Sequence, residues 1–204
     1  KLYATVDGRF TFHVVLFDLA GQLLCTMGGA ALTEVRTPAL SAVAIDRWAS
    51  PSRRIAAVLG TGREALAHVR MLAADARLDE VRVWGRRGAA AAALARTVAA
   101  DGVPIAVTVA AHSADAVDGA DVVVTTTSAN EPIVAAEAIA DTALVCAVGA
   151  TKPQRCELDP SLFTRASAVI TDSLAGAPHE CGDLIHAVAA GHTVGADPDE
   201  EEWE

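Results

Sequence analysis

The sequence predicts an α/β fold in which a parallel β-sheet is covered by helices on both faces. From residue 55 onward, short apolar segments typical of buried strands alternate with segments typical of helices, which is the pattern of a parallel sheet with crossover helices. A glycine-rich turn directly follows the first of these strands. Residues 1–50 lack the alternation, and we expect them to form part of a smaller α+β domain.

The first 50 residues contain a predicted β-hairpin followed by a helix. We predict strands over residues 10–17 and 23–27 and a helix over residues 34–49. The segment between the strands includes Gly21 and is typical of a turn. Thr33 is the expected N-cap of the helix, and Ser50-Pro51-Ser52 should end it at a domain boundary.

The rest of the chain supplies the predicted parallel sheet and its helices. The predicted strands are residues 55–59, 81–84, 105–109, 121–124, 143–148 and 168–171, and the predicted helices are residues 63–76, 89–100 and a short 115–117. Such short strands between helices, with turn residues at their ends, favour βαβ units.

The charge is concentrated at one end of the chain. The net charge is −10, but residues 197–204 hold six acidic and no basic residues, which leaves −4 (20 acidic against 16 basic residues) for the remainder. We expect this tail to be a solvated, mobile end. The composition offers no basic face of the kind that binds nucleic acid, and no apolar run is long enough to cross a bilayer.

The four cysteines are predicted to be reduced and structural. Cys25, Cys146, Cys156 and Cys181 form no C-x-x-C pair and lack the spacing of a zinc site, so we expect no metal. Free thiols favour a cytoplasmic location. We find no signal peptide, and because the chain begins at Lys1 rather than Met we expect a further segment upstream.

The segment Gly60-Thr61-Gly62-Arg63-Glu64-Ala65 fits the pattern G-x-G-x-x-A. It follows a predicted buried strand and opens a predicted helix, which is the context that the pattern requires. Gly60 permits the tight turn, Gly62 lets the backbone approach a pyrophosphate, and Ala65 keeps helix and sheet close. The helix N-terminus offers unpaired N–H groups to the phosphates. We therefore predict a Rossmann-type domain whose glycine loop, residues 60–65, binds a dinucleotide.

The residues after the second strand favour NADP(H) over NAD(H), although NAD(H) stays possible. An acid at this place would bind the ribose 2′-hydroxyl of NAD, but the chain has Gly85-Arg86-Arg87. Two guanidinium groups in place of an acid suit a 2′-phosphate. The alternative is a solvated pair of arginines at the start of a helix.

Two further loops and one arginine are candidates for binding the cofactor or the substrate. Thr125-Thr126-Thr127 and Val148-Gly149-Ala150 follow the fourth and fifth strands, and strand ends of this kind bind ligands in open α/β sheets. Their small and hydroxylated residues suit contact with ribose and nicotinamide. The alternative is that both segments are ordinary loops. Arg36 is predicted in the first turn of its helix, where a guanidinium and a helix N-terminus could together hold a substrate carboxylate; the alternative is a surface arginine.

Several segments recur together in one family. They are Leu32-Thr33-Glu34-Val35-Arg36-Thr37-Pro38-Ala39, the glycine loop, Val83-Trp84-Gly85-Arg86, Gly119-Ala120-Asp121-Val122-Val123-Val124-Thr125, Ala147-Val148-Gly149-Ala150, Glu157-Leu158-Asp159-Pro160 and Glu180-Cys181-Gly182-Asp183. In combination they resemble the ornithine cyclodeaminase/μ-crystallin family over nearly the whole chain, to about residue 190.

The resemblance implies a homodimer that acts on a small α-amino or α-imino acid. It implies that Arg36 and Lys1 bind the substrate carboxylate. It divides the chain into part of a substrate-binding and dimerisation domain (1–50), an NAD(P)-binding Rossmann domain (51–185) and a C-terminal extension with the acidic tail (186–204). Segments of the family before residue 1 and after about residue 190 are expected to be missing.

One departure from the family separates two activities. Cyclodeaminases of the family carry an aspartate shortly after the glycine that follows the fifth strand, and the matching residue here is Thr151. A hydroxyl cannot act as a carboxylate base at neutral pH, and Gly149-Ala150-Thr151-Lys152-Pro153 is more similar to the imine reductases of the family. Thr151 and Lys152 are the expected catalytic positions, with Lys152 either a proton donor or a solvent-facing residue.

We therefore predict an NADP(H)-dependent reductase of the C=N bond of an α-imino acid, either a ketimine or a cyclic imine such as a pyrroline or piperideine carboxylate. One alternative is an ornithine cyclodeaminase, which uses NAD and releases ammonia. A second is a non-enzymatic NADPH-dependent binding protein, and a third is an amino acid dehydrogenase.

Overall fold

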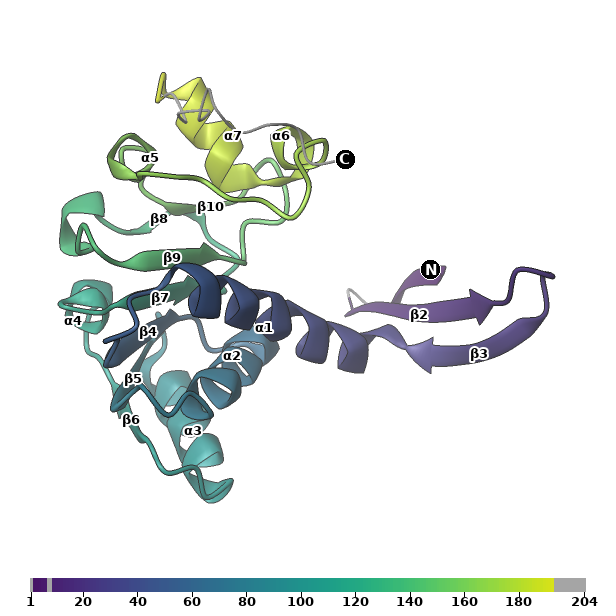
Figure 1. Ribbon diagram of the computed structural model, residues 1–204, viewed down its shortest axis with the longest axis horizontal. Coiled ribbons are helices and arrows are strands. Elements are labelled where there is room, and N and C mark those ends of the chain that lie inside the picture. The colour runs from purple at the N-terminus through teal and green to yellow at the C-terminus, as the bar shows by residue number, and fades with distance from the viewer. Residues whose placement is uncertain (1, 7–8, 193–204) are drawn as a thin grey trace.

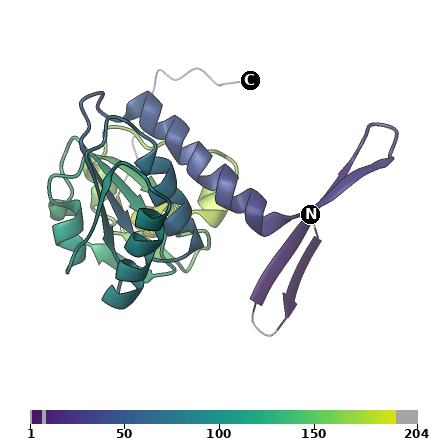
Figure 2. The same cartoon turned by 90° about the horizontal axis from the view of Figure 1, so that it is seen from below.

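The computed structural model describes residues 2–6 and 9–192 of the chain. They form a three-stranded antiparallel sheet, one long helix, and a five-stranded parallel sheet with helices on both faces (Figure 1). The antiparallel sheet projects away from the parallel one, and the long helix α1 joins the two (Figures 1 and 2). The predicted α/β class is confirmed.

The antiparallel sheet contains the predicted hairpin and one strand more. Its strands are β1 (Leu2–Val6), β2 (Arg9–Phe17) and β3 (Leu23–Gly28), hydrogen-bonded in that order. In the turn between β2 and β3, Asp18 Oδ1 accepts hydrogen bonds from the backbone N–H groups of Ala20 and Gln22 at 2.9 and 2.8 Å. Gly21 there has φ 80°, in the left-handed region that glycine adopts without strain.

Helix α1 (Gly29–Trp48) starts earlier than predicted. The strand β3 passes directly into it at Gly28, whose extended backbone (φ −66°, ψ 125°) makes it the N-cap. The prediction that Thr33 is the N-cap is therefore wrong: its hydroxyl donates within the helix to the carbonyl of Gly29, at 3.0 Å. As a consequence Arg36 lies in the second turn of α1, not in the first.

The parallel sheet has the order β6-β5-β4-β7-β9, with the first strand of the unit in the centre. Its strands are β4 (Ile55–Leu59), β5 (Glu80–Trp84), β6 (Ala106–Val109), β7 (Val122–Thr125) and β9 (Leu144–Ala147). The helices between them are α2 (Arg63–Ala73), α3 (Gly88–Ala100) and α4 (Ser113–Val117). This is the doubly wound arrangement of a Rossmann-type fold.

A smaller layer follows β7 along the chain. It contains β8 (Asn130–Val134), the 3₁₀ turn η1 (Ala136–Ala138), β10 (Cys156–Leu158), α5 (Leu162–Arg165), α6 (Ala177–Glu180) and α7 (Gly182–Ala189). Strands β8 and β10 pair in parallel as a sheet of their own. Helix α7 runs across residue 185, where we expected the Rossmann domain to end.

The prediction of a sixth strand over residues 168–171 is wrong. The segment has no strand in the structure, and Ile170 is 54% exposed. Its polar contacts are local, since the Ser173 N–H donates to the Thr171 hydroxyl at 3.2 Å. The apolar residues of the segment predict a strand, but a strand also needs a neighbouring strand to pair with. Local composition does not show whether such a partner is present.

Alternate residues of the central strand pack into two separate cores. Ala56 and Val58 face α1, α2 and α3, whereas Ala57 and Leu59 face α4 and the segment around β8. All four side chains are fully buried, as expected of a strand covered on both faces. Within the described ranges, no helix is both long and apolar enough to cross a membrane.

Candidate functional site

The carboxyl ends of the parallel strands form one continuous edge. The Gly60 N–H donates to the Trp84 carbonyl at 2.8 Å, and the Thr126 N–H donates to the Leu59 carbonyl at 2.8 Å. The Val148 N–H donates across the next strand pair to the carbonyl of Thr125 at 3.0 Å. These bonds bring together the four predicted cofactor segments, residues 60–65, 85–87, 125–127 and 148–150. In open α/β sheets this edge, beside the central strand, is where ligands bind.

The glycine loop has the backbone that the sequence predicts. Gly60 has φ 142°, and a Cβ there would lie 2.2 Å from Thr126 Oγ1, so the position excludes any side chain. Gly62 caps the start of α2 without a side-chain hydrogen bond, and a Cβ on Gly62 would meet nothing within 4 Å. The open space in front of free N–H groups fits a pyrophosphate. Ala65 is fully buried, and its small side chain lets α2 pack closely on the sheet.

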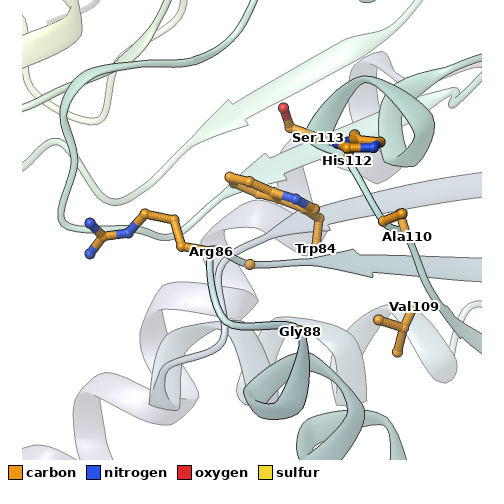
Figure 3. A pocket seen from close by; sticks show the side chains of 9 residues that line it. Trp84, Arg86, Gly88, Val109, Ala110, His112 and Ser113 are labelled. Atoms are coloured by element: carbon orange, nitrogen blue, oxygen red, sulfur yellow. The ribbon is translucent and has the colours of Figure 1, made fainter.

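A pocket lies between the ends of β5 and β6 (Figure 3). It is lined by Trp84, Gly85, Arg86, Gly88, Val109, Ala110, Ala111, His112 and Ser113, none of which is acidic. Residues 109–113 were not among the predicted site residues. Val109 ends β6 and residues 110–113 follow it, so the rule that ligands bind at the carboxyl ends of strands could have found them.

Arg86 and Arg87 are exposed at the start of α3. Figure 3 shows Arg86 extending from the end of β5 away from His112 and Ala110. Neither arginine forms an ion pair with any acid in the described part of the chain. Gly85 packs closely on the glycine loop, because a Cβ on it would lie 2.4 Å from Thr61 Cγ2.

Arg36 is exposed on α1, facing the start of α2. The guanidinium lies close enough to Glu64 to lower the pKa of that carboxyl, but burial outweighs it and the pKa is raised. Glu64 Oε2 is buried without a hydrogen-bond partner among the described residues. An ion pair of 3.6 Å between Arg63 and Glu34 also joins the two helices here. Arg36 thus stands beside the glycine loop, although not at a helix N-terminus.

A buried histidine fixes α1 against α2. His68 is fully buried, with Nδ1 2.7 Å from the Glu64 carbonyl and Nε2 3.0 Å from Ser41 Oγ. Because a carbonyl only accepts, Nδ1 carries the proton and the Ser41 hydroxyl donates to Nε2. Burial lowers the pKa of His68, which favours the neutral ring. The pair holds the helix that carries Arg36 at a set position relative to the glycine loop.

The loop after β9 carries the two predicted catalytic residues. Thr151 and Lys152 are both exposed, and the Thr151 N–H donates to the Gly149 carbonyl at 2.9 Å. The loop is attached to α7: the Gly182 N–H donates to the Ala150 carbonyl at 2.9 Å. Lys1, the other predicted substrate residue, lies outside the described residues.

Glu157, which sequence reasoning treated only as part of a family segment, lies directly behind this edge. The side chain is fully buried and accepts hydrogen bonds from Thr125 Oγ1 at 3.0 Å, from the Gly149 N–H at 2.8 Å and from the Thr127 N–H. Burial raises the pKa of Glu157, while the hydrogen bonds with Thr127 and Thr125 oppose the rise. The carboxyl joins two of the predicted cofactor segments.

The cysteines do not form a reactive or metal-binding group in the structure. All four are free, and burial raises the pKa values of Cys146 and Cys156 to about 11, so both are neutral thiols at physiological pH. No three histidine, cysteine or acidic side chains of residues 2–6 and 9–192 gather in a way that could hold a metal ion.

The strand order and the glycine loop define a Rossmann-type fold of the dinucleotide-binding class. The chain belongs to the ornithine cyclodeaminase/mu-crystallin family, whose model matches residues 4–195.

Two curated relatives and one solved structure illustrate the likeness. The chain is 37% identical to the ketimine reductase mu-crystallin of Mus musculus over 173 residues, which cover 84% of this chain and 53% of that protein. It is 36% identical to Delta(1)-pyrroline-2-carboxylate reductase 2 of Burkholderia ambifaria over 171 residues, with 82% and 52% covered. The structure of the iminosuccinate reductase of Paracoccus denitrificans in complex with NAD+ superimposes with a TM-score of 0.78 at 28% identity, covering 90% of this chain and 56% of that one. The chain spans about half the length of the curated relatives it matches.

Proposed function

We propose that the protein carrying this chain reduces the C=N bond of a small α-imino acid with a nicotinamide dinucleotide. The observation that carries the proposal is Thr151, which lies in the loop after β9 with its N–H bonded to the Gly149 carbonyl, at the position where we expect a cyclodeaminase of the family to have a carboxylate. Relatives named as reductases of ketimines, pyrroline carboxylate and iminosuccinate support it. The dinucleotide, when bound, supplies the hydride.

In this proposal the residues of the chain bind and orient the two reactants. The N–H groups of the glycine loop hold the pyrophosphate, and residues 125–127 and 148–150 hold the ribose and nicotinamide. Arg36, exposed next to the glycine loop, binds the substrate carboxylate. Lys152 Nζ is the candidate group to hold the proton that the substrate nitrogen takes up.

The test is the consumption of NADPH by the full-length protein, followed by absorbance. The substrates are Δ1-pyrroline-2-carboxylate, Δ1-piperideine-2-carboxylate and the ketimine formed from a 2-oxo acid and methylamine. We expect at least one imine to consume NADPH with one amino acid formed per turnover. Turnover of ornithine with NAD to proline and ammonia, with no reduction of any imine, would contradict the proposal in favour of the cyclodeaminase.

We further propose that NADPH binds more tightly than NADH. The support is the absence of an acid from the pocket of Figure 3 together with the two exposed arginines, Arg86 and Arg87, beside it. A 2′-phosphate would pair with them, and no carboxylate in the pocket lining would repel it. Calorimetric titration of the chain with each cofactor tests this, and equal affinities would contradict it.

We also propose a homodimer built on the antiparallel sheet. The sheet and α1 expose many apolar side chains, including Leu16, Phe17, Leu23, Leu24 and Val35, and apolar surface of this extent is typical of an interface. Light scattering at micromolar concentration should give twice the mass of the chain. Leu24→Glu should shift the mass to that of the monomer, whereas Leu174→Glu, at an exposed leucine before α6, should not.

A further inference from the structure

We propose that Glu157 is a positioning residue for the nicotinamide half of the proposed cofactor site, and that Asp183 holds Glu157 in place. The inference rests on the proposed function, because it assigns the loops after β7 and β9 to the ribose and nicotinamide. Neither acid lines the pocket at β5 and β6, and both act from behind the sheet edge.

The carboxyl of Glu157 connects the loop after β7 with the loop after β9. Its Oε2 accepts from Thr125 Oγ1 at 3.0 Å and from the Gly149 N–H at 2.8 Å, and its Oε1 accepts from the Thr127 N–H. Thr125 is the last residue of β7 and Thr127 lies in the loop after it, whereas Gly149 follows β9. A single carboxyl thus ties the two loops together beyond the point where the backbone bond from Val148 to Thr125 joins the strands.

The two loops and the carboxyl are packed closely around Gly149. A Cβ on Gly149 would lie 2.3 Å from the carbonyl oxygen of Thr127 and 2.4 Å from Glu157 Oε2. No atom separates these groups, so a displacement of the carboxyl moves at least one loop.

Asp183, in the first turn of α7, fixes the backbone of Glu157. Its Oδ1 accepts from the N–H groups of Glu157 and Leu158 at 2.6 and 3.0 Å, and the side chain is 1% exposed. The next residue back, Gly182, abuts the loop of Thr151 and Lys152, because a Cβ on it would lie 2.5 Å from the Lys152 carbonyl. The start of α7 therefore supports both the carboxyl and the loop in front of it.

Two buried acids would destabilise the fold if they served only to pack the interior. Burial raises the pKa of both carboxyls, and Asp183 adds to the rise at Glu157 because like charges repel. Asp183 Oδ2 is in addition buried with no hydrogen-bond partner among the described residues. Apolar residues would cost less in a buried position that served only packing. What the acids provide is a set of directed bonds: Glu157 accepts from the N–H groups of Thr127 and Gly149, and Asp183 accepts from the N–H groups of Glu157 and Leu158.

Glu157→Gln tests the role with a nearly isosteric side chain. The amide keeps one acceptor oxygen but turns an NH₂ group toward a donor, so at least one loop must move. We expect the affinity for NADPH to fall about ten- to a hundredfold. The affinity for 2′,5′-ADP, the adenosine fragment of the cofactor, should stay within about twofold of the wild type, because its proposed place lies at β5 and β6. Glu137→Gln, at an exposed glutamate in η1, is the matched control and should change neither affinity.

Calorimetric titration of the 204-residue chain with both ligands gives the result. An unchanged NADPH affinity in Glu157→Gln, or an equal loss of NADPH and 2′,5′-ADP binding, overturns the inference, since the second outcome marks a general structural role. If the wild type binds 2′,5′-ADP but not NADPH, the assignment of these loops fails; if it binds neither, the proposed function fails with it.

If Glu157→Gln does not fold, hydrogen exchange on the wild type tests the same role of Glu157. The amides of Thr127 and Gly149 should exchange slowly in the free chain, and more slowly still with NADPH but not with 2′,5′-ADP. Exchange of both amides at the rate of an unprotected peptide, or equal protection by the two ligands, overturns the inference.

Discussion

Adding a methyl group at Gly62 should weaken cofactor binding and leave the fold intact. The methyl has room in the free chain, because an ideal Cβ on Gly62 meets nothing within 4 Å and the backbone is extended (φ −84°, ψ −170°). Alanine restricts the unfolded chain, which stabilises by about 0.4–1 kcal/mol. It is also a poorer N-cap than glycine, which opposes that gain. We expect a net change within about 1 kcal/mol, or a melting-temperature shift of about 2–4 °C or less.

The same methyl occupies the space in which the pyrophosphate would approach α2. It would separate the phosphate from the free N–H groups at the helix start. Each charge-assisted hydrogen bond lost costs about 1.5–3 kcal/mol. The affinity for NADPH should therefore fall at least about tenfold, and over about a hundredfold if two bonds are lost.

The assay combines a fluorescence titration with NADPH and a thermal unfolding curve for each variant. Gly28→Ala is the matched control, because Gly28 is also an N-cap glycine with nothing within 4 Å of its Cβ position, at the start of α1. It should lose no affinity. The reasoning is refuted if Gly62→Ala binds NADPH like the wild type, or if both variants lose affinity equally.

Three further predictions concern side chains. Replacing both Arg86 and Arg87 with alanine should remove most of a preference for NADPH over NADH of about five- to 150-fold (about 1–3 kcal/mol), seen in paired titrations; an equal loss for both cofactors would mean that the arginines are only a solvated pair. Arg36→Ala should lower kcat/KM for the imine by about tenfold to over a hundredfold and leave cofactor affinity unchanged, and the opposite pattern would refute the assignment. His68 has a lowered pKa in the folded chain, so the unfolded chain binds more protons and the unfolding free energy should decrease as pH falls below about 6.5 toward the folded value. In urea unfolding at pH 7.5 and 5.5 the decrease should be smaller for His68→Gln, and equal decreases in both proteins would contradict this.

The βα alternation and the glycine loop could be predicted because their signals are local. Each apolar strand such as Ile55–Leu59 is short and ends in turn residues. Gly60 is required by the backbone geometry at its own position, and Gly62 is the glycine that the dinucleotide-binding pattern expects beside a pyrophosphate. The hairpin was predictable for the same reason, since Gly21 and Asp18 form the turn with neighbouring residues.

The parts that sequence reasoning missed depend on contacts between distant residues. No turn separates β3 from α1, because the chain passes directly from strand to helix at Gly28. The 168–171 segment is apolar but has no strand partner in the structure. Glu157 receives its three hydrogen bonds from residues 8 to 32 positions away, so no local pattern distinguishes it from a surface glutamate. Arg36 lies beside the glycine loop because α1 packs on α2 through Ser41 and His68, and no local pattern predicts that contact.

The central claim is that this protein transfers hydride to the carbon of a C=N bond. The most direct measurement is the fate of deuterium from NADPH with both hydrogens at C4 of the nicotinamide replaced by deuterium, with Δ1-pyrroline-2-carboxylate as substrate and mass spectrometry and NMR of the product. The account predicts proline with one deuterium at Cα, in an amount equal to the NADPH consumed, and no release of ammonia. Product without deuterium, or turnover only with ornithine and with ammonia released, would contradict it.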